Sequence, residues 1–93
     1  MSLFTIRVEL HDASWSDYNA LAKQLAQQGV VDVIRGDDGR TYKLPPAEYN
    51  YEGNATAEQV RDAVRRVANV TGRQNAVFVS DAICRSWAGL EFA

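Results

Sequence analysis

The chain has 93 residues, 46% of them hydrophobic and 24% charged, and its formal net charge is −2. This length fits one globular domain covering residues 1–93, large enough to form a core without disulfide cross-links. A slightly acidic chain lacks the overall positive charge of most nucleic-acid-binding domains, so such binding would require a local basic patch. The single cysteine excludes an intrachain disulfide, and one cysteine with one histidine excludes the usual zinc site.

The apolar runs and the first residues bear on location and cofactors. Residues 1–4 lack the basic stretch and long apolar segment of a signal peptide. No apolar run approaches the roughly 18 residues that a membrane span needs. No glycine-rich phosphate loop or dinucleotide-binding fingerprint is present. We therefore expect a cytoplasmic protein that contacts no membrane and carries no small-molecule cofactor.

The N-terminal third predicts a strand followed by a helix. Residues 4–10 place an apolar side chain at every second position, which is typical of a half-buried strand. Ser14 has the character of a helix N-cap, with Asp17 three residues later near the positive end of the helix. Gly29 is suited to a left-handed C-cap. A helix is therefore expected over residues 15–28.

The middle of the chain predicts a hairpin and an interrupted strand. The β-branched residues at 30–34 predict a second strand, and a turn follows at 37–40. Residues 41–44 would pair with that strand. Pro45 and Pro46 cannot donate to a ladder, and the extended pattern resumes at 47–52. The third strand is therefore expected to be split, bulged or at a sheet edge.

The last part of the chain repeats the order of helix and strand. Thr56 begins a capping-box pattern, and apolar residues at helical spacing follow it until Gly72. Residues 75–82 predict another strand. The tail, residues 83–93, is apolar enough to pack as an extra strand or against a second subunit.

The order strand, helix, strand, strand, helix, strand predicts a ferredoxin-like α+β sandwich. Its antiparallel sheet would carry both helices on one face and leave the other face free. A free face and an apolar tail together favour a homodimer, with Trp87 and Phe92 as the expected dimer contacts.

The first candidate site lies where the first strand meets the first helix. Glu9, His11 and Asp12 could serve as catalytic groups, because carboxylates bind Mg²⁺ or position water and a histidine titrates near neutral pH. The alternative is structural: Asp12 caps the turn, Glu9 pairs with a neighbouring cation, and His11 is a surface imidazole.

Basic residues in the strands form the second candidate site. Arg7, Arg40 and Lys43 would bind nucleic acid if the polar sides of their strands coincide on the open face. Tyrosines at 42, 49 and 51 would then complete a platform for stacked bases. The alternative is a solvated face of mixed charge or a dimer surface, since acidic residues occupy the same segments.

The second helix and its C-terminal turn carry further arginines. The set consists of Arg61, Arg65, Arg66 and Arg73, and it fits a solvated helix face with ordinary ion pairs or, alternatively, a phosphate site. A Cys84–His11 nucleophile pair is conceivable in space, although no motif surrounds the cysteine.

Several blocks of the chain carry a family resemblance. These are residues 4–18 (FTIRVELHDASWSDY), 38–45 (DGRTYKLP), 47–49, and the helix beginning at Thr56. The chain resembles, over most of its length, a family of small bacterial proteins related to the GhoS-type antitoxin of type V toxin–antitoxin systems. The resemblance implies a ferredoxin-like fold similar to the small CRISPR-associated endoribonucleases, which work as paired subunits.

The resemblance also implies an activity. The antitoxin of this family is a sequence-specific endoribonuclease that cuts the messenger of its toxin. The CRISPR-associated relatives place an Asp at the end of the first strand, and this chain reads Glu9-Leu10-His11-Asp12 there. Asp12 or Glu9 would have to take that place, with His11 or Asp12 assisting attack by the 2′-hydroxyl or binding a divalent metal such as Mg²⁺.

The implied RNA contacts are Arg7, Lys43 and, on the first helix, Lys23, whose alternative role is that of a solvated lysine. A different class of function stays open beside RNA cleavage. The chain could be a non-catalytic homodimeric interaction module that uses the open sheet face, which the negative net charge favours.

Overall fold

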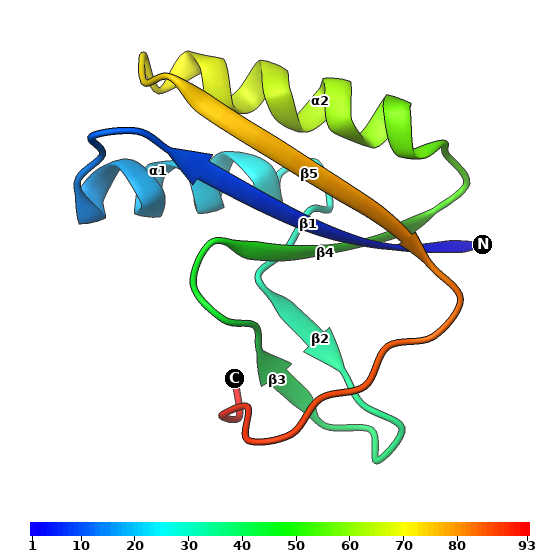
Figure 1. The fold of residues 1–93 in the computed structure, drawn as a ribbon. Helices are drawn as coiled ribbons and strands as arrows, with labels where there is room; N and C mark the ends of the chain where they lie inside the picture. The colour runs from blue at the N-terminus through cyan, green and yellow to red at the C-terminus, as the bar shows by residue number, and fades with distance from the viewer.

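The computed structural model describes residues 1–93 as a small α+β protein with two helices and five strands (Figure 1). The helices are α1 (Trp15–Ala26) and α2 (Ala57–Val70). The strands are β1 (Ser2–Leu10), β2 (Val33–Arg35), β3 (Thr41–Lys43), β4 (Glu48–Gly53) and β5 (Asn75–Ala82). Neither helix has the length and hydropathy needed to cross a membrane.

Strand β1 is the centre of a three-stranded antiparallel sheet, between β4 and β5. Strands β2 and β3 form a separate two-stranded antiparallel hairpin. One backbone pair joins the two sheets. The Val31 N–H donates to the Asn50 carbonyl at 3.0 Å, and the Asn50 N–H donates to the Val31 carbonyl at 2.7 Å.

This arrangement corrects one part of the fold prediction. A single four-stranded sheet was expected, but the second strand leaves the main sheet after Val31 and pairs with β3 instead, so the ferredoxin-like order is not confirmed. The predicted break after residue 44 is the cause. Pro45 and Pro46 interrupt the ladder, and Ala47 takes a left-handed backbone (φ +69°) that turns the chain from β3 into β4.

The core lies on one face of the main sheet. Phe4, Ile6, Val8 and Leu10 alternate along β1, and all of them are buried against the helices. Both α1 and α2 lie behind this face (Figure 1), as the sequence pattern predicted. The helices add the remaining aliphatic side chains of the core: Leu21, Leu25, Val60, Val64, Val67 and Ala68. Each large side chain buried in this way contributes about 1.5–3 kcal/mol.

Capping residues set the helix starts where the sequence placed them. The Ser14 hydroxyl accepts from the Asp17 N–H while the Asp17 carboxylate accepts from the Ser14 N–H. Thr56 and Gln59 form the same reciprocal pair in front of α2. Each capping box satisfies two N–H groups that the first helical turn leaves free. Helix α1 ends at Ala26, and Gly29 then takes the positive φ expected of it.

The tail crosses the open face of the sheet and ends on the hairpin. The Lys43 N–H donates to the Glu91 carbonyl at 2.8 Å, and the Ala93 N–H donates to the Thr41 carbonyl at 3.0 Å. Phe92 lies opposite Tyr42 in an isolated antiparallel bridge. Within this chain, therefore, the tail pairs with β3 through a single bridge and forms no further strand.

Trp87 and Phe92, the expected dimer contacts, both contact Tyr42 of their own chain. The ring centroids are 5.9 Å apart for Trp87 and 5.2 Å apart for Phe92. Trp87 is half-buried there, whereas Phe92 stays 58% exposed. Of the two rings, only Phe92 keeps most of its surface for another partner.

Candidate nucleic-acid interface

The end of β1 brings two of the three predicted catalytic residues together. His11 Nε2 lies 3.0 Å from Glu9 Oε1, and both side chains are about half exposed or more. The residues are two apart, so a strand geometry places them on the same side. Asp12 stands apart in the following turn with a left-handed backbone (φ +53°) and an exposed side chain. No group of three or more His, Cys, Asp or Glu side chains is arranged to hold a metal ion.

His11 borders a hollow at this end of the sheet, which we call the polar hollow. Its lining contains no hydrophobic residue and consists of His11, Arg65, Asn69, Gly72, Arg73, Gln74 and Asn75. The backbone N–H of His11 donates to the Gln74 carbonyl at 2.8 Å, which fixes the backbone of His11 beside the start of β5. One histidine and two arginines therefore face one shallow depression.

Neighbouring groups hold this lining in place. Arg73 Nε donates to Asp17 Oδ2 at 3.1 Å and so ties the hollow to the first turn of α1. The Ser14 N–H, and after it the Ser14 hydroxyl and Arg73, lower the pKa of the Asp17 carboxyl from its ordinary value. Asn75 donates to Asn69 Oδ1 at 2.9 Å, but its own Oδ1 is the one buried side-chain atom without a hydrogen-bond partner. The contacts of Arg73 with Asp17 and of Asn75 with Asn69 thus fix two side chains of the lining.

Sequence reasoning did not bring Arg65 and Arg73 to His11. It assigned them to a helix face and its end, more than fifty positions along the chain. The β1–β5 register makes the connection, because it pairs Leu10 with Asn75 and so places Arg73 beside the turn that follows β1. The sequence places Arg73 just before a predicted strand, but it does not show which end of β1 that strand meets.

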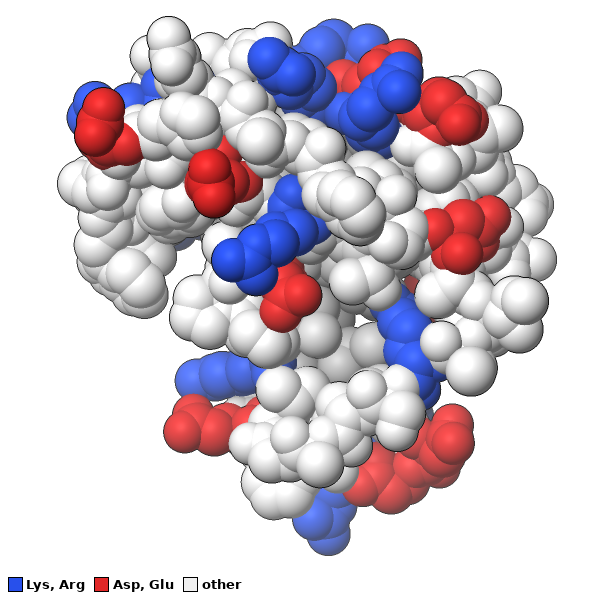
Figure 2. Space-filling view, in the orientation of Figure 1, with Lys and Arg blue, Asp and Glu red and all other residues white.

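The open sheet face does not form the expected basic platform. Arg7 lies opposite Glu48 of β4 and Phe78 of β5, and Figure 2 shows acidic and basic side chains interspersed over this side of the molecule. Tyr49 and Tyr51 point toward the helices, and Tyr49 is only 3% exposed. Bases therefore cannot stack on these two tyrosines from the open side.

The other predicted cations lie away from Arg7. Arg40 stacks over Phe92, with its Cζ 5.0 Å from the ring centroid. Lys23 is exposed on α1 and makes no side-chain hydrogen bond or ion pair. Lys43 leaves the open face altogether and borders a second depression.

This second depression, which we call the apolar groove, runs between α1 and the β2–β3 hairpin. Helix α1 supplies one wall with Trp15, Tyr18, Asn19 and Ala22, which follow helical spacing. The other wall and the floor come mainly from Asp32, Val33, Lys43, Pro45, Pro46 and Tyr49. The groove has a volume of about 590 Å³, which is within the range of small-ligand sites.

Two tyrosines show how the groove is supported. The Tyr18 hydroxyl accepts from the Leu10 N–H at 2.9 Å and donates to the Leu10 carbonyl, so the ring is fixed against the end of β1. Burial, with a smaller contribution from Asp32, raises the pKa of Tyr49 to about 12. Trp15 differs from both because 77% of its surface is exposed at the rim.

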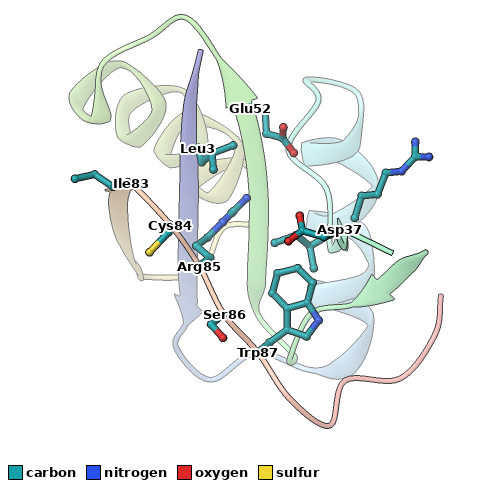
Figure 3. Close-up of a pocket in the computed structure, with 10 residues that line it drawn as sticks. Leu3, Asp37, Glu52, Ile83, Cys84, Arg85, Ser86 and Trp87 are labelled. Carbon is teal, nitrogen blue, oxygen red and sulfur yellow. The ribbon is translucent and has the colours of Figure 1, made fainter. Parts of the chain in front are cut away.

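A third depression lies under the tail, and its polar groups serve the fold. Figure 3 shows Arg85 extending from the tail toward β1 and β4, with Glu52 and Asp37 around it. The Arg85 guanidinium donates to Asn50 Oδ1 at 2.7 Å and to the Phe4 carbonyl and Thr5 Oγ1 at 3.3 Å each. Arg85 thus fastens the tail to the sheet.

The conceivable Cys84–His11 pair does not form. Cys84 follows β5 at the end where Ala82 pairs with Leu3, whereas His11 follows β1 at the opposite end of the sheet. A strand rises about 3.3 Å per residue, so the length of β1 separates the two side chains.

Neither the models of known protein families nor the curated proteins give a match to this chain. The polar hollow and the apolar groove flank the first turn of α1 on two sides, because Asp17 contacts the hollow and Trp15 lines the groove.

Proposed function

We propose that this protein is a GhoS-like, antitoxin-type RNA-binding protein that holds an RNA phosphodiester in the polar hollow. The observation that carries the proposal is the lining of this hollow, which has two arginines and a histidine and no carboxylate. Guanidinium groups are well suited to phosphate because their N–H donors match two oxygens at once. Asp17 and Glu9 lie next to the hollow and orient Arg73 and His11.

The Glu9–His11 pair adds the means for cleavage. When Nε2 carries the proton, it donates to Glu9, and Nδ1 is left as a base. His11 would take the proton of the 2′-hydroxyl while that oxygen attacks phosphorus and the bond to the 5′-oxygen breaks. The imidazolium would return the proton to the leaving oxygen, giving a 2′,3′-cyclic phosphate, and the arginines would stabilise the charge on the phosphorane.

The topology is compatible with a modified ferredoxin-like sheet, and we include this in the proposal. The order β5, β1, β4 continues with Val31 on the far side of β4 through one backbone pair. The segment after α1 would then be a shortened edge strand of that sheet, whose remainder has turned away to form the hairpin. This arrangement, with the sequence resemblance, supports the antitoxin type.

Binding is tested with the double variant Arg65→Ala/Arg73→Ala and single-stranded oligoribonucleotides in a filter-retention assay. Loss of two phosphate contacts should weaken binding at least about tenfold at low salt and reduce the salt slope by about 1–2. Arg66→Ala is the matched control, because Arg66 is exposed on the same helix and makes no side-chain bond. Equal loss in the control, or no retention by the unmodified protein at low salt, would refute the proposal.

Cleavage is tested separately with His11→Gln, in the presence and absence of Mg²⁺ and Mn²⁺. The variant should retain RNA and lose cleavage, because glutamine keeps the polarity but cannot exchange the proton. Absence of cleavage by the unmodified protein with every RNA would remove the enzymatic part and leave the binding part standing.

A non-catalytic homodimeric interaction module is the second candidate. It is favoured by Phe78, which is 71% exposed on the open face of β5, a strand whose outer edge is unpaired. Sedimentation equilibrium of the unmodified protein and of Phe78→Ser distinguishes the candidates. Salt-insensitive dimerisation that this variant abolishes, with no RNA retained, would favour the module.

A further inference from the structure

The apolar groove has no part in the phosphate chemistry of the polar hollow. We infer that it binds one nucleobase of single-stranded RNA, with Lys43 against the adjoining phosphate. This inference rests on the proposed function, which supplies RNA as the ligand. Three features of the groove support this inference: an exposed aromatic ring, polar groups in the lining, and a position beside the polar hollow.

The stacking surface is the indole of Trp15. A tryptophan is normally well buried, yet 77% of this one is exposed at the rim of a groove with largely apolar walls. Pro45 and Pro46 form part of the opposite wall, and each ring locks the backbone φ angle at its position, which limits the conformations of this wall. A flat ring entering the groove would gain stacking on the indole.

The polar groups of the lining select the kind of ring. Asn19, Asp32 and Lys43 place an amide, a carboxylate and an ammonium among the apolar walls. A base edge presents both donors and acceptors and can pair with the first two of these groups, and a phosphate suits the third. An aliphatic peptide side chain would desolvate these groups without bonding to them, which costs free energy.

The position of the groove fits the path of one strand. Trp15 lies four residues after His11, and Asp17 of the same helical turn contacts Arg73 of the polar hollow. An RNA strand that passes the start of α1 would therefore place a phosphate in the hollow and an adjacent base in the groove. The two subsites would then act on one ligand.

The decisive experiment compares an oligoribonucleotide with the same backbone carrying abasic sites. Trp15→Ala should lower affinity for the normal oligonucleotide about tenfold or more and leave affinity for the abasic one unchanged. Trp15→Phe should recover most of the loss, because it restores a stacking ring. Val70→Ala, an exposed apolar side chain at the end of α2, is the control and should change neither affinity.

This experiment distinguishes failure of the proposed phosphate site from failure of the proposed base subsite. Arg65→Ala/Arg73→Ala should weaken both oligonucleotides, because the hollow contacts only the backbone. Equal weakening of both oligonucleotides by Trp15→Ala would overturn the base subsite and leave the phosphate site intact. Equal binding of normal and abasic RNA by the unmodified protein would also overturn it.

A second measurement works even if the protein retains no long RNA. Titration with uridine or adenosine 5′-monophosphate up to about 10 mM, followed by NMR, should shift the indole N–H of Trp15 and the backbone amides of Lys43, Leu44 and Ala47. Ribose 5-phosphate, which lacks the base, should leave the indole unshifted. Equal shifts with ribose 5-phosphate, no shifts at all, or shifts with an amphipathic peptide instead of the nucleotides would overturn the inference.

Discussion

Two regions of this small protein are held together by different means. The helix-covered sheet has a cluster of 12 buried residues, with β1 at its centre. The hairpin–tail unit, residues 31–44 and 83–93, has one buried hydrophobic residue, Ile34. It depends instead on the Tyr42 aromatic contacts, a few backbone hydrogen bonds and the anchor of Arg85. Stability in the first region comes from burial, and in the second from individual directed contacts.

The two candidate surfaces draw on these two regions differently. The polar hollow is formed mainly by the first region, whereas the hairpin supplies one wall of the apolar groove. Segments with few buried contacts open locally at lower free energy than a core does. The groove should therefore be the more adaptable of the two surfaces, and the hollow the more rigid.

The largest effect is expected in the core of the sheet. Phe4→Ala removes a fully buried ring and should lower the free energy of unfolding by about 3–5 kcal/mol, measured by urea denaturation. Phe78→Ala makes the same chemical change at an exposed position of the neighbouring strand and should stay within about 0.5 kcal/mol. Similar losses in the two variants would mean that the helix-covered face is not the main source of stability.

A smaller effect is expected where the tail joins the sheet. Arg85→Met keeps much of the side chain but leaves Asn50 Oδ1 without its 2.7 Å partner, which should cost about 1–3 kcal/mol. Hydrogen exchange should speed up at the Lys43 and Ala93 amides, which bond between the tail and β3, and remain slow along β1. Arg66→Met serves as the control. If exchange rises equally in β1 and in the hairpin, the two regions unfold as one unit.

The smallest effect is expected from acid acting on the hairpin turn. The Tyr42 hydroxyl, and then the Arg40 N–H, lower the pKa of the exposed Asp38 carboxyl below its ordinary value. Its folded pKa is below its unfolded pKa, so its contribution is present above about pH 4 and disappears as the pH falls through the folded value. Protection factors in β2 and β3, which correct for the intrinsic pH dependence of amide exchange, should therefore fall over this acid range. Asp38→Asn should make these protection factors independent of pH there, and an unchanged acid response would exclude Asp38 as the cause.

Local patterns predicted most elements because short-range chemistry determines them. Alternation along β1, the capping boxes at Ser14 and Thr56, and the turn before Arg40 depend on neighbours within a few positions. The polar hollow depends instead on a strand register that joins Leu10 to Asn75. No local pattern encodes such a register, so Arg65 and Arg73 could not be assigned to His11 from the sequence.

For a similar reason, the sequence did not predict that the hairpin leaves the main sheet. The proline pair indicated a break, but a break alone does not determine where the freed strand packs. That depends on the tail, which supplies β3 with a backbone partner and Tyr42 with aromatic neighbours. Trp15 lies within the helix predicted over residues 15–28, but helical spacing alone cannot show that the groove wall opposite it stands away from the helix.

Asp12 and Ala47 are the two non-glycine residues with a positive φ. An L-residue gives up about 1–2 kcal/mol in this conformation, with aspartate among the more tolerant residues. Asp12 directly follows His11 at the hollow, and Ala47 lines the groove. The backbone is therefore least relaxed beside both surfaces, so selection for thermal stability alone would favour glycine or asparagine at these positions.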